Sequence, residues 1–597
     1  MGFWARVKRE GRFLRGLLRT LKRVKSVRPD SKDLVCDDIE AAVDRFGSRT
    51  AIAFEGKTLT YDQLDALANR YANWARGRGI KRGDTVALFM PNRLEYLAVW
   101  YGFSKVGIAT ALINNNLTGS ALAHSLNICS ATHVIVDAET AVLFAAVREL
   151  LLRPMTEWTV GGGASRPDRD LDQTLRGVSA LRPDRMGARG GLVARDTALY
   201  IFTSGTTGLP KAAKVTHMRA QLYMRGFAAA TEARADDRIY VVLPLYHATG
   251  GLCAVGAALL NGAAVVLKRK FSSSQFWDDV VQERCTMFVY IGELCRYLVT
   301  QPERPEERMH KLRLAFGNGL RPDVWERMVQ RFRIPRILEF YGATEGNVSI
   351  LNFDGKTGAV GRIPKYVRSR FNVRLVRFDV ETEEPMRGPN GLCMECRPGE
   401  IGEALGKIGS EARTAYAGYA DKAASNSKIL RDVFARGDAW FRTGDLLRQD
   451  DEGYFYFVDR IGDTFRWKGE NVATTEVAGR LDEAPGVLES NVYGVHVPEA
   501  DGRAGMAALV VDESFDPAVF GKFVEEHLPT YAQPVFLRLQ PQIEVTGTFK
   551  HRKADLVADG FDPKKTKARV YVKLPGKGYV KLTPSVLAKV EAGEVRL

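Results

Sequence analysis

The sequence predicts an α/β protein in which a large N-terminal domain of parallel-rich sheets covered by helices precedes a smaller α+β C-terminal domain. Its 597 residues exceed what one hydrophobic core usually serves, so at least two domains are expected. Between residues 36 and 440, helical patterns alternate with short β-rich runs, as in parallel sheets covered by helices. After about residue 460 the runs are shorter and mixed. We therefore expect an N-terminal segment over 1–35, a large domain over 36–460 and a small domain over 461–597.

Individual elements follow from the same periodicities. The clearest helix is expected over 61–76, directly after Thr60. Its apolar residues recur at the spacing of one helical face: Leu64, Leu67, Tyr71 and Trp74. Short apolar runs indicate buried strands at 85–90, 133–136, 239–243, 263–267, 287–290 and 337–341. The small domain is expected to contain strands at 454–458 and 492–497 and a helix from about residue 475.

Composition excludes several classes of protein. Hydrophobic residues at 45% and charged residues at 26% are ordinary for a globular chain, which argues against disorder. Seven scattered cysteines form no disulfide framework and favour a reducing, cytoplasmic compartment. The net charge of +15 is concentrated at one end, because residues 1–28 hold ten Lys or Arg against Glu10 alone. No nucleic-acid recognition motif accompanies this charge, so nucleic acid is not an expected partner.

The basic N-terminal segment predicts an amphipathic helix. Its apolar residues recur three and four apart, and arginines and lysines fill most positions between them. The apolar set is Phe13, Leu14, Leu17, Leu18, Leu21 and Val24. Such a helix suits the interface of an anionic membrane, so peripheral association with the cytoplasmic face is expected. A solvated tail, or a helix packed on its own domain, remains the alternative. The sequence contains no apolar run of 18 or more residues, so a membrane-spanning helix is not expected.

The strongest chemical signal is the stretch from Tyr200 to Lys211, where an apolar strand enters a loop of hydroxyls and glycines that ends in lysine. Glycines let the backbone approach a polyphosphate, hydroxyls donate hydrogen bonds and the lysine supplies charge. The candidate phosphate-binding residues are Thr203, Ser204, Gly205, Thr206, Thr207, Gly208 and Lys211. The loop is not a Walker A motif, because Pro210 and Ala212 replace its second glycine and its magnesium-binding hydroxyl. A P-loop motor or switch is therefore disfavoured.

This loop resembles the phosphate-binding signature of the acyl-adenylate-forming superfamily, which includes acyl-CoA synthetases. Further stretches resemble motifs of that superfamily in the same order, and the similarity covers roughly residues 40–560. They are Gly317-Asn318-Gly319, Tyr341-Gly342-Ala343-Thr344-Glu345-Gly346, Phe441-Arg442-Thr443-Gly444-Asp445, Asp459-Arg460-Ile461-Gly462-Asp463 and Gly547-Thr548-Phe549-Lys550.

The resemblance implies a role for each motif. Gly317, Asn318, Gly319, Tyr341 and Gly342 would form the adenine pocket. Thr344 would contact the α-phosphate, and Glu345 would supply an oxygen ligand for Mg²⁺, which needs few protein ligands beside phosphates. Asp445 and Arg460 would hold the ribose. Lys550 would be the catalytic lysine that bridges the substrate carboxylate and the α-phosphate, with Lys211, Thr344 and Glu345 as its catalytic partners.

A closer resemblance is to the fatty-acid-transport, very-long-chain acyl-CoA synthetase branch. It is carried by residues 465–477, by the ending Thr548-Phe549-Lys550 and by Gly560-Phe561-Asp562-Pro563. It supports a loop of Lys468, Gly469 and Glu470 that faces CoA. The superfamily motif Asp459–Asp463 implies a hinge at Gly462 or Asp463. The stretch Leu243–Gly251 resembles the segment that walls the acyl site, which implies a substrate wall at Tyr246 and His247, although His247 can also be a hydrogen-bonded histidine at a strand end. Glycine at position 462 departs from the usual Asp or Lys pivot but permits the required backbone rotation.

The expected activity is an ATP-dependent acid–thiol ligase. ATP, Mg²⁺ and a long apolar acid give an acyl-adenylate and pyrophosphate, and the small domain then turns about residues 460–463 so that CoA takes the acyl group. Two alternatives stay open: a membrane fatty-acid uptake protein that traps its cargo, and an acyl-AMP ligase that loads a carrier protein. The sequence does not set the chain length, and a sterol or bile-type acid remains possible.

Overall fold

The structure is a computed structural model that describes residues 3–162, 167–203, 209–498, 502–545, 552–595 and 597. Its mixed α/β architecture confirms the predicted fold class. The chain divides into two compact units. Unit 1 comprises 1–362, 406–430 and 439–441, and unit 2 comprises 363–405, 431–438 and 442–597. Residues 363–405 thus cluster with the second unit, and the domain boundaries expected from the sequence stay predictions.

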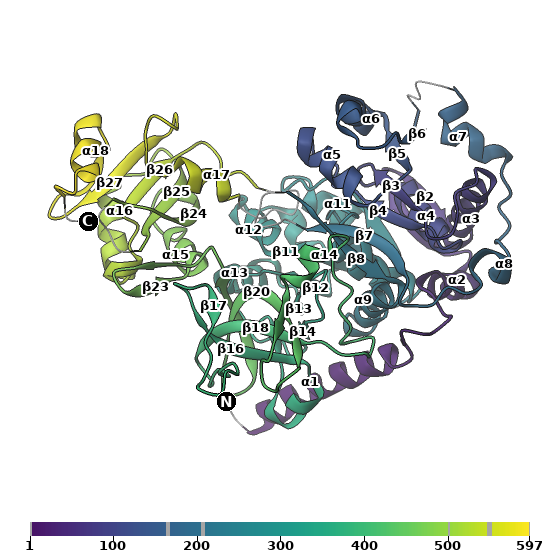
Figure 1. The fold of residues 1–597 in the computed structure, drawn as a ribbon, viewed down its shortest axis with the longest axis horizontal. Coiled ribbons are helices and arrows are strands. Elements are labelled where there is room, and N and C mark those ends of the chain that lie inside the picture. The colour runs from purple at the N-terminus through teal and green to yellow at the C-terminus, as the bar shows by residue number, and fades with distance from the viewer. Residues whose placement is uncertain (1–2, 163–166, 204–208, 499–501, 546–551, 596) are drawn as a thin grey trace. The chain divides into compact units, whose positions relative to one another are not determined.

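Unit 1 contains two sheets in which parallel pairing dominates (Figure 1). The first has the order β14-β13-β12-β11-β9-β10-β1-β2, with antiparallel strands at its two edges. Its strands are β1 (Thr50–Phe54), β2 (Lys57–Thr60), β9 (Arg238–Val241), β10 (Ala264–Leu267), β11 (Met287–Ile291), β12 (Leu314–Asn318), β13 (Ile337–Gly342) and β14 (Ser349–Leu351). The inner strands are buried almost throughout, which is why they read as continuous apolar runs in the sequence.

The second sheet of unit 1 has the order β6-β5-β3-β4-β7-β8, and only β8 runs antiparallel to its neighbour. Its strands are β3 (Thr85–Phe89), β4 (Ala109–Leu112), β5 (His133–Asp137), β6 (Thr156–Val160), β7 (Thr197–Thr203) and β8 (Lys211–Thr216). The strands expected near 85, 133, 239, 263, 287 and 337 are all present, each shifted by a few residues at most.

Helices cover both sheets. The principal ones are α2 (Val35–Phe46), α3 (Tyr61–Gly77), α4 (Leu94–Ser104), α5 (Gly119–Ile128), α6 (Ala138–Val147), α9 (His217–Ala230), α12 (Gly292–Thr300) and α13 (Pro322–Phe332). The shorter ones are α7 (Leu171–Thr174), α8 (Arg185–Arg189), α10 (Val255–Leu259), α11 (Phe276–Gln282) and α14 (Lys422–Asn426). Helix α3 confirms the prediction over 61–76: the Thr60 hydroxyl accepts the Gln63 amide at 3.2 Å, and the Gln63 side chain accepts the Thr60 amide at 2.9 Å.

The N-terminal helix α1 (Phe3–Val24) packs on its own unit along one stripe. Phe13, Leu17 and Val24 are buried, and the Phe13 ring meets Phe353 edge-on with 6.2 Å between centroids. Arg362 lies over the Phe13 ring and donates to the Glu10 carboxylate at 2.6 Å. Three of the six predicted apolar residues of this helix thus pack on their own domain, as the alternative interpretation expected. Leu14 and Leu18, by contrast, are exposed.

Unit 2 contains a two-stranded sheet of β22 (Phe465–Trp467) and β23 (Glu470–Val472) and two larger sheets. One includes the path β21-β20-β18-β16-β17, formed by β16 (Val373–Asp379), β17 (Glu384–Pro385), β18 (Ile401–Lys407), β20 (Ala439–Gln449) and β21 (Tyr454–Arg460). The other has the order β24-β25-β26-β27-β28, formed by β24 (Val487–Val495), β25 (Ala504–Val511), β26 (Phe536–Leu539), β27 (Arg569–Leu574) and β28 (Gly578–Lys581). Helices α15 (Thr474–Leu481), α16 (Pro517–His527), α17 (Ala554–Asp559) and α18 (Pro584–Glu591) accompany it. This is the small α+β region expected from the sequence.

Candidate active site

The two ends of the candidate phosphate loop are held side by side. Thr203 ends β7, Lys211 begins β8, and the two residues are paired across the antiparallel ladder. The ring of His124 contacts the Pro210 carbonyl oxygen at 3.1 Å, which fixes the chain just before Lys211. Ser204, Gly205, Thr206, Thr207 and Gly208 lie outside the described residues. The paired residues Thr203 and Lys211 therefore mark the two ends of the loop in which the sequence predicts the phosphate-binding residues.

The candidate magnesium ligand, Glu345, lies beside the ends of this loop. Strand β13 ends at Gly342, and the chain then turns through Ala343 and Thr344. The Ala343 carbonyl accepts a hydrogen bond from the Tyr223 hydroxyl at 3.0 Å. The Tyr419 hydroxyl donates to Glu345 Oε1 at 2.8 Å and also interacts with the Thr203 side chain. Tyr419 thus joins the end of the phosphate loop to the Tyr341–Gly346 motif, both in unit 1.

Burial and charge shift the pKa values of the groups around the Glu345 carboxylate. Burial, together with the Glu345 charge, raises the pKa of the Tyr419 hydroxyl, so it stays a proton donor at neutral pH. Burial lowers the pKa of Arg219, whereas Tyr223 and Glu345 oppose that shift. The Arg219 guanidinium donates to the Ala415 carbonyl at 3.1 Å. Glu345 therefore faces hydroxyl and cationic groups, which suits a negative charge that is only partly exposed.

A second cluster forms the candidate adenine loop. Gly317 and Asn318 end β12, and Gly319 has φ +81°, a conformation that glycine adopts without strain. A side chain at Gly317 would collide with the Tyr290 carbonyl oxygen, because its Cβ would lie 2.1 Å away. The Asn318 Oδ1 atom is buried, with no hydrogen bond partner among the described residues. A buried, unused acceptor at this position fits an amino group such as that of adenine.

Glu339 supports the candidate adenine loop through hydrogen bonds to the loop backbone. Its carboxyl group accepts the Leu320 amide at 3.0 Å, and it also accepts the Gly319 amide and the Tyr290 hydroxyl. Burial raises the pKa of Glu339 to about 8, although all three hydrogen bonds favour the charged form. Its side chain is fully enclosed, with 1% of the residue exposed. Glu339 therefore couples the backbone of the loop to β13.

The candidate ribose residues are cross-strand partners in unit 2. Asp445 in β20 pairs with Arg460 in β21, and Arg460 Nε lies 3.9 Å from Asp445 Oδ1. The Asp445 amide donates to the Thr443 hydroxyl at 3.1 Å, and this hydroxyl donates to the Ala404 carbonyl at 2.7 Å. An acidic group positioned on a rigid strand beside a guanidinium can accept two neighbouring sugar hydroxyls.

The expected hinge follows directly after β21. Gly462 has φ +90°, and the Asp463 carboxylate lies 3.2 Å from the Lys553 ammonium group. Lys553 also donates to the Thr474 hydroxyl at 2.6 Å. The buried Asp459 carboxylate accepts the Thr474 amide and hydroxyl, which anchors the segment on both sides of the turn. The catalytic candidate Lys550 lies outside the described residues.

The candidate CoA-side loop is a tight turn between two short strands. Lys468 and Gly469 both have positive φ angles, of +53° and +81°, between β22 (Phe465–Trp467) and β23 (Glu470–Val472). The Lys468 ammonium lies 5.8 Å from the centroid of the Trp467 ring. Lys468, Gly469 and Glu470 are exposed. The turn therefore presents a cation, an open backbone and a carboxylate to solvent.

The candidate substrate wall lies in unit 1. Tyr246 is buried and its hydroxyl accepts from the Asn116 amide at 3.3 Å, whereas His247 is half-buried with its ring 4.6 Å from that of Tyr246. Asn92 fixes the segment, since it donates to the Leu243 carbonyl at 3.1 Å and accepts the Leu245 amide at 2.9 Å. The structure thus holds the wall in place through a residue 151 positions away from Leu243.

Sequence reasoning missed four of these supporting residues: Tyr419, Glu339, Asn92 and Asp459. Asp459 belongs to the predicted hinge motif, but the motif does not indicate its role as an anchor. Glu339 stands two residues before Tyr341, so its place in a buried strand was a usable signal. Tyr419 and Asn92 belong to no sequence motif and to no periodic pattern, so the sequence alone does not indicate their roles.

The chain is similar to known proteins in sequence and in fold. The AMP-binding enzyme family matches the chain over residues 39–404. Long-chain fatty acid transport protein 1 of Mus musculus is 42% identical over 551 residues, which cover 91% of this chain and 85% of that protein. Long-chain fatty acid transport protein 3 of Homo sapiens is 44% identical over 524 residues, which cover 86% of this chain and 76% of that protein.

Solved structures share the fold at lower identity. An anthranilate CoA ligase in complex with anthranoyl-AMP matches with a TM-score of 0.74 and 20% identity, over 90% of this chain and 98% of that one. A fatty acyl CoA synthetase of Mycobacterium tuberculosis matches with a TM-score of 0.62 and 24% identity, over 88% of this chain and 98% of that one. These likenesses confirm the architecture of the fold.

Proposed function

Since this chain belongs to the AMP-binding enzyme family, we propose that it ligates a long-chain fatty acid to CoA through an acyl-adenylate intermediate. The curated relatives, which are named as long-chain fatty acid transport proteins, support the choice of a long-chain acid. The structural observation that carries the proposal is the hydrogen bond from Tyr419 to Glu345, because Tyr419 also touches Thr203 and so brings two nucleotide motifs together.

In the first half of the reaction, a carboxylate oxygen of the acid attacks the α-phosphorus of ATP. The bond from that phosphorus to the bridging oxygen breaks, and pyrophosphate leaves with the electron pair. Two anions approach each other in this step, so it gains most from positive charge placed at the α-phosphate. We assign this charge to Lys550 and Lys211, and the hydrogen bond to the α-phosphate to Thr344.

In the second half, the sulfur of CoA attacks the acyl carbon of the adenylate. The thiol proton is lost, the bond from the acyl carbon to the phosphate oxygen breaks, and AMP leaves. The exposed turn of Lys468, Gly469 and Glu470 supports this role, because its open backbone can approach a narrow pantetheine arm. We infer a change of orientation between the two halves, centred on Gly462.

Glu345 fits a role in binding Mg²⁺. Among the described residues no group of three or more His, Cys, Asp or Glu side chains could hold a metal alone. Mg²⁺ that arrives with a nucleotide needs only one or two carboxylates beside the phosphates. The hydrogen bond from Tyr419 uses Glu345 Oε1, and a carboxylate retains further lone pairs for a cation. When bound, the ion would neutralise phosphate charge.

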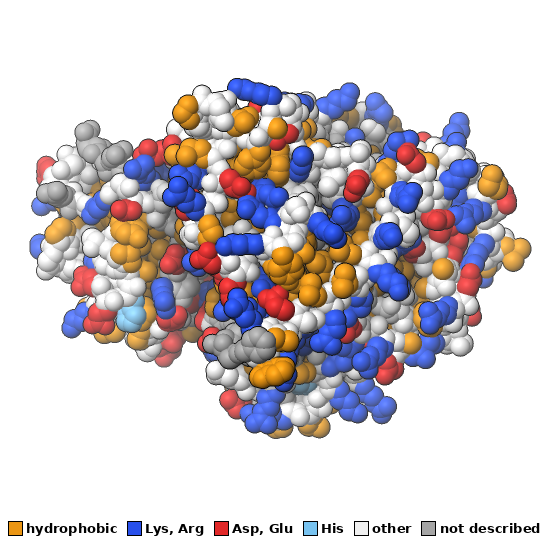
Figure 2. Space-filling view, turned by 90° about the horizontal axis from the view of Figure 1, so that it is seen from below, with side chains coloured by type: hydrophobic (Ala, Val, Ile, Leu, Met, Phe, Trp, Pro, Cys, Tyr) orange, Lys and Arg blue, Asp and Glu red, His pale blue; other side chains and the backbone are white. Residues whose placement is uncertain are grey.

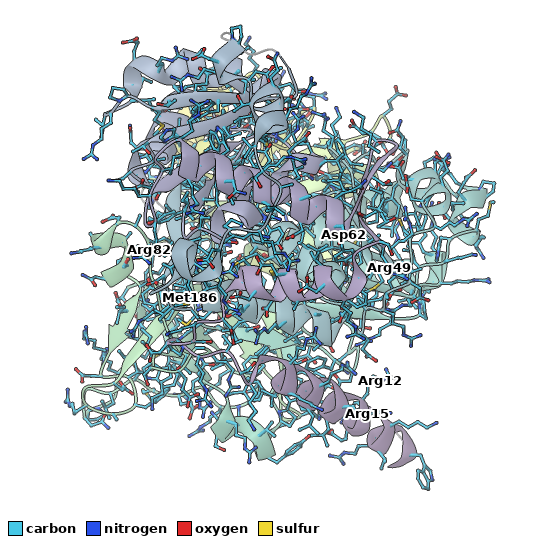
Figure 3. The ribbon with its side chains drawn as sticks, turned by 90° about the vertical axis from the view of Figure 1, so that its right-hand side faces the viewer. Arg12, Arg15, Arg49, Asp62, Arg82 and Met186 are labelled. Atoms are coloured by element: carbon cyan, nitrogen blue, oxygen red, sulfur yellow. The ribbon has the colours of Figure 1, made fainter. Side chains whose placement is uncertain are left out.

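We also propose that the protein touches a membrane peripherally through α1. None of the described helices is both long enough and apolar enough to cross one. The exposed side of α1 carries Trp4, Val7, Leu14 and Leu18, which are 74%, 46%, 37% and 63% exposed. Arg12 and Arg15 leave the helix on exposed positions (Figure 3), and the face shown in Figure 2 carries many Lys and Arg side chains with hydrophobic ones between them. This combination suits an anionic lipid interface.

The decisive experiment measures AMP and pyrophosphate release with a panel of fatty acids, in the presence and absence of CoA. We expect both products and an acyl-CoA for long chains. The change Lys550→Ala should lower adenylate formation by about a hundredfold, the scale of losing one charge stabiliser, and should largely spare thioester formation from supplied acyl-AMP. Adenylation at the wild-type rate would remove Lys550 from the mechanism.

This assay and a measurement of fatty-acid uptake together separate the alternatives. An enzyme that forms acyl-AMP but ignores CoA would be a carrier-loading ligase instead. Fatty-acid uptake that survives Lys550→Ala would favour transport without thioester formation.

A further inference from the structure

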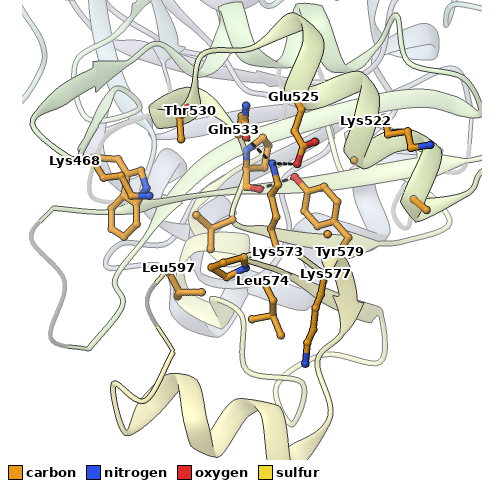
Figure 4. Close-up of a pocket in the computed structure, with 18 residues that line it drawn as sticks. Lys468, Lys522, Glu525, Thr530, Gln533, Lys573, Leu574, Lys577, Tyr579 and Leu597 are labelled. Atoms are coloured by element: carbon orange, nitrogen blue, oxygen red, sulfur yellow. Dashed lines mark hydrogen bonds and ion pairs between the residues drawn. The ribbon is translucent and has the colours of Figure 1, made fainter.

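A cavity of about 500 Å³ opens on the C-terminal sheet of unit 2, away from every residue assigned above except Lys468 (Figure 4). It lies among helix α16, the chain before β26, and the hairpin of β27 and β28. Trp467 and Lys468 line it as well, so the cavity reaches the turn that we expect to face CoA. Its volume is ordinary for a small-molecule site.

The lining of the cavity carries a net positive charge. Four lysines take part, namely Lys468, Lys522, Lys573 and Lys577, against two negative groups among the described lining residues, the Glu525 side chain and the terminal carboxylate of Leu597. The Lys573 ammonium lies in the middle of the lining, 3.1 Å from the Glu525 carboxylate and 2.5 Å from the Gln533 oxygen (Figure 4). Glu525 is thus paired within the cavity, and the exposed Lys468, Lys522 and Lys577 add further positive charge.

Trp467 contributes to the lining, but its indole nitrogen offers no donor to a ligand. The residue is 3% exposed and its Nε1 atom is itself buried. Hydrogen bond donors and positive charge therefore come from the lysines, and such a lining selects an anion that accepts several hydrogen bonds.

The hairpin between β27 and β28 allows close approach. Gly576 and Gly578 have φ angles of +70° and +66°, and they flank Lys577 at the tip. A Cβ atom at either glycine would meet nothing within 4 Å, so the space beside Lys577 is open. The backbone at this tip can therefore come near a phosphate without steric hindrance.

We propose that this cavity holds the phosphate groups at the nucleotide end of CoA. The inference rests on the proposed function, in which CoA is the phosphorylated substrate of the second half-reaction. CoA carries a 3′-phosphate and a diphosphate, whose negative charge the exposed Lys468, Lys522 and Lys577 can offset. The site lies next to Lys468, so a nucleotide bound here leaves the pantetheine arm beside the Lys468–Glu470 turn. Lys522 and Lys577 act as specificity-determining residues for the acceptor.

The test compares three acceptors in the full-length enzyme. CoA has the 3′-phosphate, dephospho-CoA lacks it, and pantetheine lacks the nucleotide altogether. The double variant Lys522→Ala/Lys577→Ala removes two exposed charges and leaves the Lys573–Glu525 pair intact. A matched control, Lys581→Ala/Lys589→Ala, removes two exposed lysines of the same unit that do not line the cavity.

We expect the KM for CoA to rise about tenfold in the cavity variant, as for the loss of charge-assisted contacts. The KM for pantetheine and the rate of ATP–pyrophosphate exchange should stay unchanged, and the control variant should behave like the wild type. Adenosine 3′,5′-bisphosphate should compete with CoA in the wild type and lose at least part of its potency in the cavity variant.

Two results would overturn the proposal while leaving the ligase assignment intact. The first is that the wild-type enzyme uses CoA and the cavity variant has the same KM for CoA. The other is an equal rise for CoA and pantetheine, which would mean that the lysines act only through the fold. Failure of the wild type to use CoA would instead defeat the proposed function itself. A loss of binding to phosphatidylglycerol vesicles with an unchanged KM would assign the cavity to a lipid phosphate.

Discussion

The hydroxyl of Tyr419 donates a hydrogen bond to the carboxylate of Glu345 across 2.8 Å, although 74 residues separate them. Tyr419 can do so because its backbone is bound to β8. The Lys214 amide donates to the Gly418 carbonyl at 2.9 Å, and the Ala420 amide donates to the Ala212 carbonyl at 2.8 Å. The strand that begins with Lys211 therefore positions the residue that orients Glu345, and both candidate nucleotide motifs share one support.

The first prediction concerns this contact. The change Tyr419→Phe removes the hydroxyl and should leave Glu345 without its fixed orientation. Hydrogen bonds to charged groups contribute about 1.5–3 kcal/mol, so the Mg²⁺ concentration for half-maximal adenylation should rise about tenfold. Glu345→Gln, which weakens the ligand itself, should have the larger effect. Both are measured by Mg²⁺ titration of pyrophosphate release.

Tyr416→Phe is the matched control. Its hydroxyl donates to the Ser425 carbonyl at 3.1 Å and not to Glu345. This variant should therefore keep the wild-type Mg²⁺ titration. If Tyr419→Phe and Tyr416→Phe give the same curve, the hydroxyl of Tyr419 does not act through Glu345.

The second prediction concerns pH and Glu339. The pKa of this carboxyl is raised to about 8 by burial, so the folded protein keeps a proton that the unfolded chain loses above about 4.5. Between these values the folded state binds more protons than the unfolded state. The contribution of Glu339 to stability is therefore complete below pH 4.5 and is lost as pH rises toward 8.

Glu339→Gln removes this dependence, because the amide does not titrate. Relative to that variant, the wild type should lose up to about 1.4 kcal/mol of stability per pH unit over this window. Thermal melting at pH 5, 6.5 and 8 checks it. A difference in melting temperature that is constant with pH would contradict the assignment.

Much of this molecule could be predicted from the sequence where the signal is local. Strand β13 was visible as an apolar run, and the Thr60–Gln63 cap lies within four residues. The support residues were not visible for a physical reason. Asn92 reaches Leu245 across 153 positions, and a single asparagine carries no periodicity that reports on such a contact. Only the assembled sheet brings the two together.

The N-terminal helix shows the same limit within one element. A spacing of three and four residues identifies an apolar stripe but not the side that meets the protein. In the structure Phe13 and Leu17 pack inward, while Leu14 and Leu18, one position further along, face outward. The single stripe that the sequence predicts is therefore two adjacent stripes, one buried and one exposed. Which of them is buried depends on Phe353, which is distant in sequence.

The third prediction concerns the hinge. Gly462 has φ +90°, and a Cβ atom there would meet nothing within 4 Å, so any effect of substitution comes from the backbone. Proline fixes φ near −65° and cannot adopt this turn. We expect Gly462→Pro to abolish one half-reaction and spare the other, because each needs a single orientation. Adenylation is measured by pyrophosphate exchange, and thioester formation from supplied acyl-AMP.

Gly56→Pro provides the comparison. Gly56 has φ +77° and equally open surroundings, but it lies in the turn between β1 and β2. Its substitution should affect both half-reactions alike, through stability. The two-orientation scheme fails if folded Gly462→Pro protein loses both halves equally.

The last prediction concerns the exposed stripe of α1. Deleting residues 2–28 would also remove Phe13, Leu17 and Val24 from the core, so point changes give a cleaner test. Leu14→Ser/Leu18→Ser keeps every buried contact and every charge of the helix. Each leucine buried in a lipid interface contributes on the order of 1 kcal/mol or more, so the pair should lower partitioning into anionic vesicles at least tenfold. Activity on a short, soluble acid should stay unchanged.

The control is Val142→Ser/Leu152→Ser, which removes two apolar side chains that are even more exposed, at 70% and 83%, from another part of unit 1. Vesicle sedimentation of this variant should equal that of the wild type. Raising the salt to about 1 M, where charges are screened beyond roughly 3 Å, should weaken binding of the wild type and the control alike, because both keep the arginines and lysines of α1. If Leu14→Ser/Leu18→Ser protein sediments with anionic vesicles as the control does, the outer face of α1 does not bind the membrane.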